Sequence, residues 1–250
     1  MPDMDCIYPD WPAPKTVKAF TTSRKNGFSS ASYASLNLAQ HVEDDNAIVE
    51  RNREYLIEYF QLPSAPVWLQ QTHSNTVIVA DDFQHVLIPP EADASWTACP
   101  NIVCAVLTAD CLPVFFTNQQ GDRVAVTHAG WRGVLNGIIS DSFFATGIAV
   151  EDCLVWLGPA IGAENFEVGA DVYQAFTRKS PENSKAFKQT DEQHWLCDIY
   201  QLARIELQQL GIQSVYGGGF CTYSDDEHFY SFRRDGVQTG RMASLIWLSD

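Results

Sequence analysis

Short runs of apolar residues, rich in β-branched and aromatic side chains, recur along the chain between polar and glycine-containing stretches. Runs of this length and composition are typical of β-strands. The pattern predicts eight strands, at residues 17–21, 67–69, 76–80, 102–108, 123–127, 154–157, 214–216 and 244–248.

Three other segments place apolar residues at the spacing of a helix face, which predicts helices over residues 46–60, 133–145 and 198–210. The predicted strands and helices alternate irregularly. This favours the α+β class, with mixed sheets covered by helices, over a doubly wound parallel sheet. No GxGxxG or Walker A sequence occurs, so nucleotide binding by those loops is excluded.

The length and composition are those of an ordinary globular protein. The 250 residues, 46% hydrophobic and 19% charged, contain no internal repeat or long linker. We expect a single domain over residues 1–250, with residues 1–14 as a loosely attached N-terminal arm. This arm lacks the features of a signal peptide, and apolar runs such as 102–107 are too short to span a membrane. We therefore expect a soluble, cytoplasmic protein.

The net charge of −15 restricts the partners. A surface this acidic repels nucleic acid and anionic membranes, so we expect the chain to bind neither. A small anionic substrate could bind only in a locally basic pocket. The seven cysteines include no CxxC pair and follow no export signal. We expect reduced thiols, without disulfide bonds at Cys6, Cys99, Cys104, Cys153 and Cys197.

Histidine or cysteine stands beside the end of a predicted strand in three segments: 70–75, 108–113 and 127–133. Their His73, Cys111 and His128 can converge in space although they are distant in sequence. Two imidazoles and a thiolate form a ligand set for Zn²⁺ that leaves one position for water. By spacing alone, hydrogen-bonded core histidines and a buried apolar cysteine are the more common explanation.

Gly130 and Gly133 flank Trp131 and Arg132 just before the predicted helix at residue 133. Glycines allow close backbone approach, and the free N–H groups at a helix start can bind an anion together with Arg132. A tight strand-to-helix turn with Trp131 packed in the core explains the same residues equally well.

Two further regions are rich in side chains that bind anions or sugars: residues 21–29 with 35–38, and residues 229–236 with 239–241. Their arginines are Arg24 in the first region and Arg233, Arg234 and Arg241 in the second. Guanidinium groups recognise phosphate and carboxylate through their planar fork. For any single one of these arginines, a salt bridge to the acidic surface is the simpler role.

Ordered motifs along almost the whole chain resemble the laccase-domain family. This family is known both as multicopper polyphenol oxidases and as purine nucleoside phosphorylases, and it includes the peptidoglycan editing factor. The matching residues are 22–24, 35–38, 41–45, 52–53, 71–73, 92–94, 109–113, 128–133, 158–162, 166–169, 221–222, 229–234 and 240–241.

The resemblance implies a four-layer α/β/β/α arrangement with mixed sheets, similar to the catalytic domain of cytotoxic necrotizing factor. It also implies zinc ligands at His73, Cys111 and His128. The implied activities are phosphorolysis of adenosine, inosine, guanosine and methylthioadenosine, and deamination of adenosine. Ser74 replaces a usual glycine, and Lys25-Asn26 departs from the family loop, so the substrate preference is open.

The first functional hypothesis is a zinc-dependent purine nucleoside phosphorylase that also deaminates adenosine. Phosphorolysis needs a phosphate held against the anomeric carbon, and deamination needs an activated water at C6 of adenine. We expect Arg24, Asn37, Gly130 and Arg132 to bind substrate or phosphate, and Asp110 to act as an acid or base. The combined deaminase signature of HxE with a downstream PCxxC is absent, so deamination would use another arrangement.

Two alternatives use the same residues. His₂Cys is also a blue-copper ligand set, so a copper polyphenol oxidase stays open, although the six histidines form no HxH pair for further copper centres. Cys111 and His128 as nucleophile and base would make a hydrolase that edits peptidoglycan precursors. A non-catalytic binding module is disfavoured because the unusual residues cluster by chemistry. We expect a monomer or weak homodimer whose partners are a nucleoside and inorganic phosphate.

Overall fold

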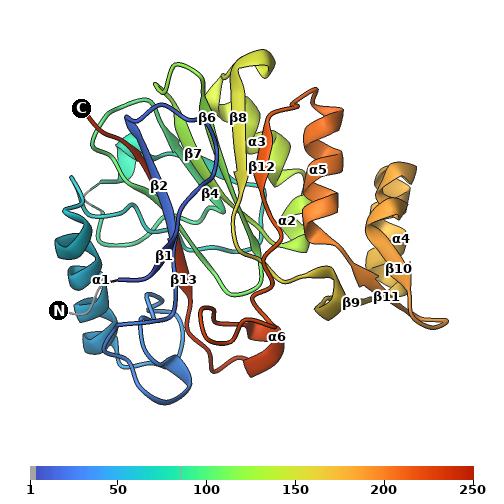
Figure 1. Ribbon diagram of the computed structural model, residues 1–250, viewed down its shortest axis with the longest axis horizontal. Coiled ribbons are helices and arrows are strands. Elements are labelled where there is room, and N and C mark those ends of the chain that lie inside the picture. Colours follow the sequence, from blue (N-terminus) through green and yellow to red (C-terminus); the bar gives the residue numbers. More distant parts are fainter. Residues whose placement is uncertain (1–3, 85) are drawn as a thin grey trace.

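Two β-sheets packed face to face form the centre of the molecule in the computed structural model, which describes residues 4–84 and 86–250 (Figure 1). The smaller of these two sheets has the order β1-β2-β13-β5, from β1 (Cys6–Ile7), β2 (Val17–Thr22), β13 (Met242–Leu248) and β5 (Cys104–Thr108). Its neighbouring strands are antiparallel, and Val67 adds a parallel bridge at the β5 edge. The strand predicted at 67–69 is therefore reduced to this isolated bridge.

The larger sheet has the order β12-β8-β6-β7-β4-β3. Its strands are β12 (Val215–Gly217), β8 (Cys153–Leu157), β6 (Leu112–Asn118), β7 (Val124–Ala129), β4 (Ala94–Thr97) and β3 (Val77–Val79). The inner pairs are antiparallel, whereas β12 and β3 each run parallel to their neighbour. The α+β class with mixed sheets is confirmed, although the central strand β6 was not predicted.

Side chains alternate between the two faces of a strand, and this rule separates the layers. On β13, Ala243 and Leu245 pack with helix α1 (Asn46–Phe60), whereas Ile246 and Leu248 face the larger sheet. Each face of the smaller sheet is therefore buried, one under α1 and the other against the second sheet.

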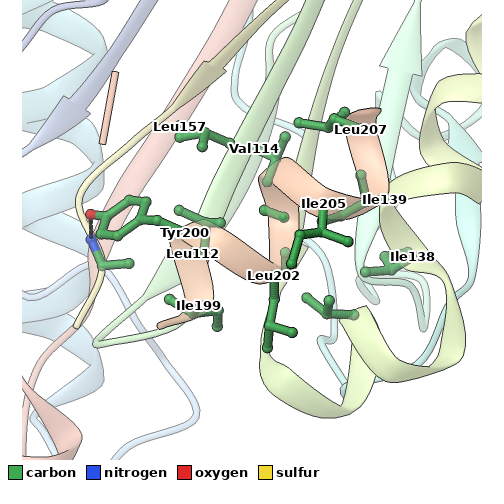
Figure 2. Packing of buried hydrophobic residues seen from close by; sticks show 14 of the residues in the cluster. Leu112, Val114, Ile138, Ile139, Leu157, Ile199, Tyr200, Leu202, Ile205 and Leu207 are labelled. Atoms are coloured by element: carbon green, nitrogen blue, oxygen red, sulfur yellow. Dashed lines mark hydrogen bonds between the residues drawn. The ribbon is translucent and has the colours of Figure 1, made fainter. Parts of the chain in front are cut away.

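Strand β6 divides its side chains in the same way. Leu112 and Val114 pack with α3 (Ile138–Thr146) and α5 (Ile199–Gln209), as Figure 2 shows. Phe115 points the other way and meets Trp156 in the layer between the sheets, with ring centroids 5.1 Å apart. The resulting order of helix, sheet, sheet and helix agrees with the layering that the family resemblance implies.

The helix predicted over residues 133–145 is two helices. α2 (Trp131–Asn136) ends at Gly137, whose φ of 94° lies in the left-handed region, and α3 begins directly afterwards. A glycine adopts this conformation at little cost and closes a helix. The other two predicted helices, α1 and α5, are confirmed and begin on side-chain caps from Asp45 and Asp198.

A further small unit extends beyond α5 (Figure 1). It consists of α4 (Ala170–Lys179) and an antiparallel sheet of β9 (Glu167–Gly169), β11 (His194–Cys197) and β10 (Phe187–Gln189). No helix or strand was predicted from the sequence between residues 158 and 197. The described residues also form the short helix α6 (Phe232–Asp235) and 3₁₀ turns at Ala31–Tyr33, Ala80–Phe83, Val150–Asp152, Ala163–Asn165 and Pro181–Ala186.

Residues 4–14 are attached more firmly than the loose arm predicted for residues 1–14. Strand β1 pairs with β2, Met4 is buried, and Asp10 accepts a hydrogen bond of 3.1 Å from the indole of Trp156. Residues 1–3 lie outside the described residues. All seven cysteines are free, as predicted. Within residues 4–84 and 86–250, every helix is too short or too polar to cross a lipid bilayer.

The packing between the sheets leads to a stability prediction for Phe115. The ring is fully buried, so we expect Phe115→Ala to lower the free energy of unfolding by about 3–5 kcal/mol. Phe144 on α3 is 65% exposed, and Phe144→Ala should change it by less than about 1 kcal/mol. Urea unfolding of both variants measures the difference, and equal effects would contradict the assigned layers.

Candidate functional site

The order of side chains along β7 places His128 at the end of the layer between the two sheets. Val124 and Val126 point into this layer, and His128 is the next residue of the same face. Cys111 directly precedes β6, whose Pro113 is the register partner of His128. His73 comes from the loop that leads to β3.

The three side chains that were selected from the sequence meet in space. One ligand atom from each of His73, Cys111 and His128 lies within 4.8 Å of the others. The Cys111 Sγ is 4.0 Å from His73 Nε2, and the two imidazole centroids are 4.9 Å apart. These separations allow the three atoms to bind one cation after small shifts, because zinc bonds are about 2.0–2.3 Å long.

Gln71 fixes the loop that carries His73. Its side-chain amide donates to the Leu107 carbonyl at 2.8 Å, and its amide oxygen accepts the Leu107 N–H at 2.7 Å. This side chain thereby continues the hydrogen bonding of the β5 edge. His73 itself has a φ of 59°, in the left-handed region that few non-glycine residues occupy.

Asp93 is a residue of the site that the sequence reasoning missed. It is fully buried next to β4, and its Oδ1 lies 2.8 Å from His128 Nδ1 and accepts the His73 N–H at 3.1 Å. Oδ2 accepts hydrogen bonds from the backbone and hydroxyl of Ser74. A single carboxylate thus orients both imidazole-bearing segments. Because it occupies His128 Nδ1, the other ring nitrogen is left for Cys111 or a metal.

These contacts explain the charge state of Asp93. Burial raises the pKa of its carboxyl group, but hydrogen bonds and charge from His128, with hydrogen bonds from Ser74, outweigh burial and lower it to about 2. Within the sequence, the signal was an acidic residue between two alanines, Ala92 and Ala94, in a motif shared with the family. This motif carried no hint of its partner.

Cys111 and His128 shift each other's pKa. Burial raises the pKa of the Cys111 thiol, but the charge of His128 and hydrogen bonds from both imidazoles lower it to about 6. Burial lowers the pKa of His128, whereas Cys111 and Asp93 raise it to about 9. The lowered pKa favours the thiolate form of Cys111, which is the form that binds metal or acts as a nucleophile.

Gly130 provides space for this group. A Cβ atom at this position would lie 2.9 Å from His73 Cδ2 and 3.1 Å from the Cys111 Sγ. Gly130 also precedes α2, which begins at Trp131 and not at the predicted Gly133. The contacts of Gly130 are thus with the candidate ligands, and its predicted role in binding substrate stays a prediction.

The three side chains open onto a cavity of about 370 Å³, a volume within the usual range of about 300–1,000 Å³ for small-molecule sites. Apolar residues line much of it: Leu107, Ala109, Trp131, Ile161, Phe166, Ile199 and Phe232. Its basic lining residues are His41, Arg132, Arg233 and Arg241. The acidic chain therefore contains the locally basic pocket that an anionic substrate requires.

Arg24 and Asn37, which were predicted to bind substrate or phosphate, lie outside the residues that line this cavity. Arg24 donates to the carbonyls of Ala34 and Asp226 and stacks on Tyr230. Asn37 is fully buried and accepts the backbone N–H of Arg241 at 3.0 Å. Both side chains therefore make hydrogen bonds that hold neighbouring loops. The role of Arg24 and Asn37 in phosphate binding stays a prediction.

Asp110 and Arg132 do line the cavity. Both carboxylate oxygens of Asp110 accept hydrogen bonds, from the Thr222 hydroxyl at 2.6 Å and the Arg233 N–H at 2.7 Å. This carboxylate therefore ties the C-terminal loops to the end of β5, and its predicted acid or base role stays a prediction. Arg132 is exposed, and its guanidinium lies over the Trp131 ring.

The fold and the cavity define an α+β protein with a candidate His₂Cys metal site in a basic pocket. The chain belongs to the family described as multi-copper polyphenol oxidoreductase laccase, whose family model matches residues 18–249. This match confirms the resemblance that the motifs indicated.

Bacterial relatives of the chain bear the name purine nucleoside phosphorylase. A Pseudomonas aeruginosa protein of this name is 48% identical over 245 residues, which are 98% of each chain. The Escherichia coli protein YfiH, with the same name, is 46% identical over 97% of this chain and 98% of its own. These relatives support an enzyme of that kind.

Solved structures share the fold over the full length. A Neisseria meningitidis protein of family model DUF152 superposes with a TM-score of 0.94 at 43% identity and full coverage of both chains. YlmD from Geobacillus stearothermophilus also gives 0.94, at 27% identity over all of this chain and 98% of its own.

The hydrogen bonds of Asp93 predict its effect on metal affinity. We expect Asp93→Asn to weaken zinc binding by about 10–100-fold, because removal of a carboxylate that orients a metal-binding histidine has effects of this size. Asp171→Asn on the exposed start of α4 is the matched control and should bind zinc normally. Competition with a chromophoric chelator measures both affinities. Wild-type affinity in Asp93→Asn would remove the carboxylate from this role.

Proposed function

We propose that the protein is a zinc-dependent purine nucleoside phosphorylase that acts on adenosine, inosine, guanosine and methylthioadenosine, and that it also deaminates adenosine. The observation that carries the proposal is the meeting of His73, Cys111 and His128 at a cavity that also contains three arginines. The names of the relatives supply the purine nucleoside as substrate class.

The donor set fits zinc. Two imidazoles and one thiolate are ordinary zinc ligands, and three protein ligands leave one position for a reacting group. The low pKa of Cys111 favours the thiolate, and Gly130 leaves room beside it. When bound, zinc supplies a Lewis acid at this place in the cavity.

The other lining residues suit the two substrates of phosphorolysis. Apolar side chains such as Leu107, Ile161 and Phe166 can enclose the base and exclude water. Arginines on the wall can hold inorganic phosphate against the anomeric carbon while positive charge develops on the ribose. Deamination instead requires C6 of adenine to face the His73–Cys111–His128 group, so it depends on how the base lies in the cavity.

Two other functions compete for the same residues. A copper polyphenol oxidase accords with the description of the family, but multicopper catalysis needs several metal centres. Among residues 4–84 and 86–250, one group of three His, Cys, Asp or Glu side chains is arranged to hold an ion. A Cys–His hydrolase that edits peptidoglycan precursors is favoured by the lowered pKa of Cys111 beside the raised pKa of His128.

Removal of a ligand separates these functions. In Cys111→Ala and His128→Ala we expect zinc affinity and phosphate-dependent release of base to fall together. Zinc affinity and base release should each fall by more than about 10–100-fold, which is the effect of losing a residue that only orients a metal ligand. The measurement is zinc and copper content by mass spectrometry beside base release from adenosine, inosine, guanosine and methylthioadenosine, with ammonia release for deamination.

Each alternative gives a different result in the same experiment. Full metal and full turnover in Cys111→Ala would contradict the proposal. An active wild type without stoichiometric metal would transfer the chemistry to Cys111 and His128 as nucleophile and base. Stoichiometric copper with oxidation of phenols, and no base release, would support the oxidase. Exposed Cys99, replaced by alanine, is the matched control.

A further inference from the structure

Arg241 directly precedes β13, and both its backbone N–H and its carbonyl are hydrogen-bonded. Its N–H donates to Asn37 Oδ1 at 3.0 Å, and its carbonyl accepts the Leu38 N–H at 3.4 Å. Asn37 is fully buried and is itself held by Asp44. The side chain of Arg241 therefore reaches the cavity from a rigid stem, and no flexible loop has to order before it can bind a ligand.

The guanidinium of Arg241 is charged but incompletely paired. Its Nη1 donates to the carbonyls of Thr239 and Gly240 at 2.7 and 2.9 Å. Within residues 4–84 and 86–250, no hydrogen bond from Nε or Nη2 is present, and no carboxylate lies within ion-pair distance. Burial lowers the pKa of this group, the nearby charges of Cys111 and Asp110 oppose that shift, and a guanidinium stays protonated in proteins. A partly buried cation of this kind is stabilised by a counter-ion.

Two other arginines near the C-terminal loops, Arg234 and Arg24, already have protein partners for most of their guanidinium groups. Arg234 forms an ion pair with Asp235 at 2.8 Å and donates to three backbone carbonyls. Arg24 has its Nε and Nη1 on carbonyls and lies outside the cavity lining.

Of the other arginines that line the cavity, Arg132 and Arg233 are exposed, and Arg233 Nη1 donates to the Glu167 carbonyl at 2.9 Å. Arg241 differs from both because its guanidinium is partly buried and its backbone is held by Asn37.

The chemistry of the Arg241 guanidinium selects the ligand. Nε and Nη2 form the side-on fork of a guanidinium, which binds two oxygens of one phosphate or carboxylate. His41 also lines the cavity, and burial and the Arg241 charge lower its pKa. A neutral imidazole adds a hydrogen bond without a second charge. Phosphorolysis needs one oxyanion in this pocket, namely inorganic phosphate.

We propose that Arg241, with His41 beside it, forms the phosphate site of the cavity, and that Asn37 acts as its positioning residue. This inference rests on the proposed function for the identity of the anion. It reassigns phosphate binding from Arg24 to a residue that the sequence analysis left in a general cluster. Asn37 lies outside the cavity lining and reaches the pocket only through its hydrogen bond to the Arg241 backbone.

The test is calorimetric titration of inorganic phosphate into the zinc-loaded protein, together with the phosphate dependence of base release. We expect Arg241→Gln to raise the dissociation constant for phosphate by about tenfold or more, the size of one lost charge-assisted hydrogen-bond pair. Arg241→Lys keeps the charge without the fork, and we expect it to weaken binding by at least about threefold. Arg24→Gln tests the phosphate-binding role first predicted from the sequence, and we expect it to lose less affinity than Arg241→Gln. Arg178→Gln, on the surface of α4, is the matched control.

Zinc content and thermal unfolding are measured on each variant. If Arg241→Gln folds poorly, the phosphate affinity of Arg241→Lys is the deciding measurement. Unchanged phosphate affinity in a folded, zinc-loaded Arg241 variant overturns the inference, as does loss of binding in Arg24→Gln alone. A wild type that releases no base but binds phosphate through Arg241 would refute the proposed phosphorylase and leave the anion site standing. Phosphate-dependent release of base by the wild type, together with an unaffected Arg241 variant, would support the proposed phosphorylase and refute the anion site at Arg241.

Discussion

The buried carboxylate of Asp93 connects the parts on which the candidate site depends. It binds His128 on β7 and the backbone of residues 72–74, so the two imidazoles keep a fixed relation to each other. The register of β4 and β7 holds this carboxylate in place, since the His128 N–H donates to the Asp93 carbonyl at 2.7 Å. The position of the ligands is therefore set by the larger sheet, and a loop alone would not fix it.

Charge is distributed unevenly in this protein, and the pocket depends on that distribution. The chain carries a net charge of −15, yet arginines at three positions line one cavity beside a thiolate. An acidic exterior disfavours nucleic acid and other polyanions, whereas a local cluster of guanidinium groups can still bind a small anion. This contrast between the surface and the cavity favours a small anion over a polyanion as a ligand.

The sequence was sufficient for those parts of the fold in which local pattern and tertiary structure agree. Helices α1 and α5 combine an apolar face with an Asp cap and were found from these signals. Strand β6 was missed although it is central, because Pro113 lacks the N–H expected of a central strand. The break at Gly137 was missed because a glycine costs a predicted helix only about 1 kcal/mol.

In the candidate site too, residue type predicted some of the functional residues, whereas others depend on tertiary contacts. His73, Cys111 and His128 could be selected by residue type, since few other side chains bind zinc. Asp93 could not, because its function comes from contacts with residues 19–35 positions away in the chain. The sequence also could not distinguish Arg24 from Arg241. Both are arginines in polar loops whose guanidinium groups donate to backbone carbonyls, and only the tertiary structure determines which of them lines the cavity.

The central claim is that His73, Cys111 and His128 hold one zinc ion, and X-ray absorption at the zinc edge tests it most directly. For the protein loaded with one equivalent of zinc, we predict one sulfur neighbour at about 2.3 Å and two imidazole nitrogens at about 2.0–2.1 Å. Cys111→Ala should lose the sulfur contribution. A zinc spectrum without sulfur in the wild type, or with two or more sulfur neighbours, would contradict the account.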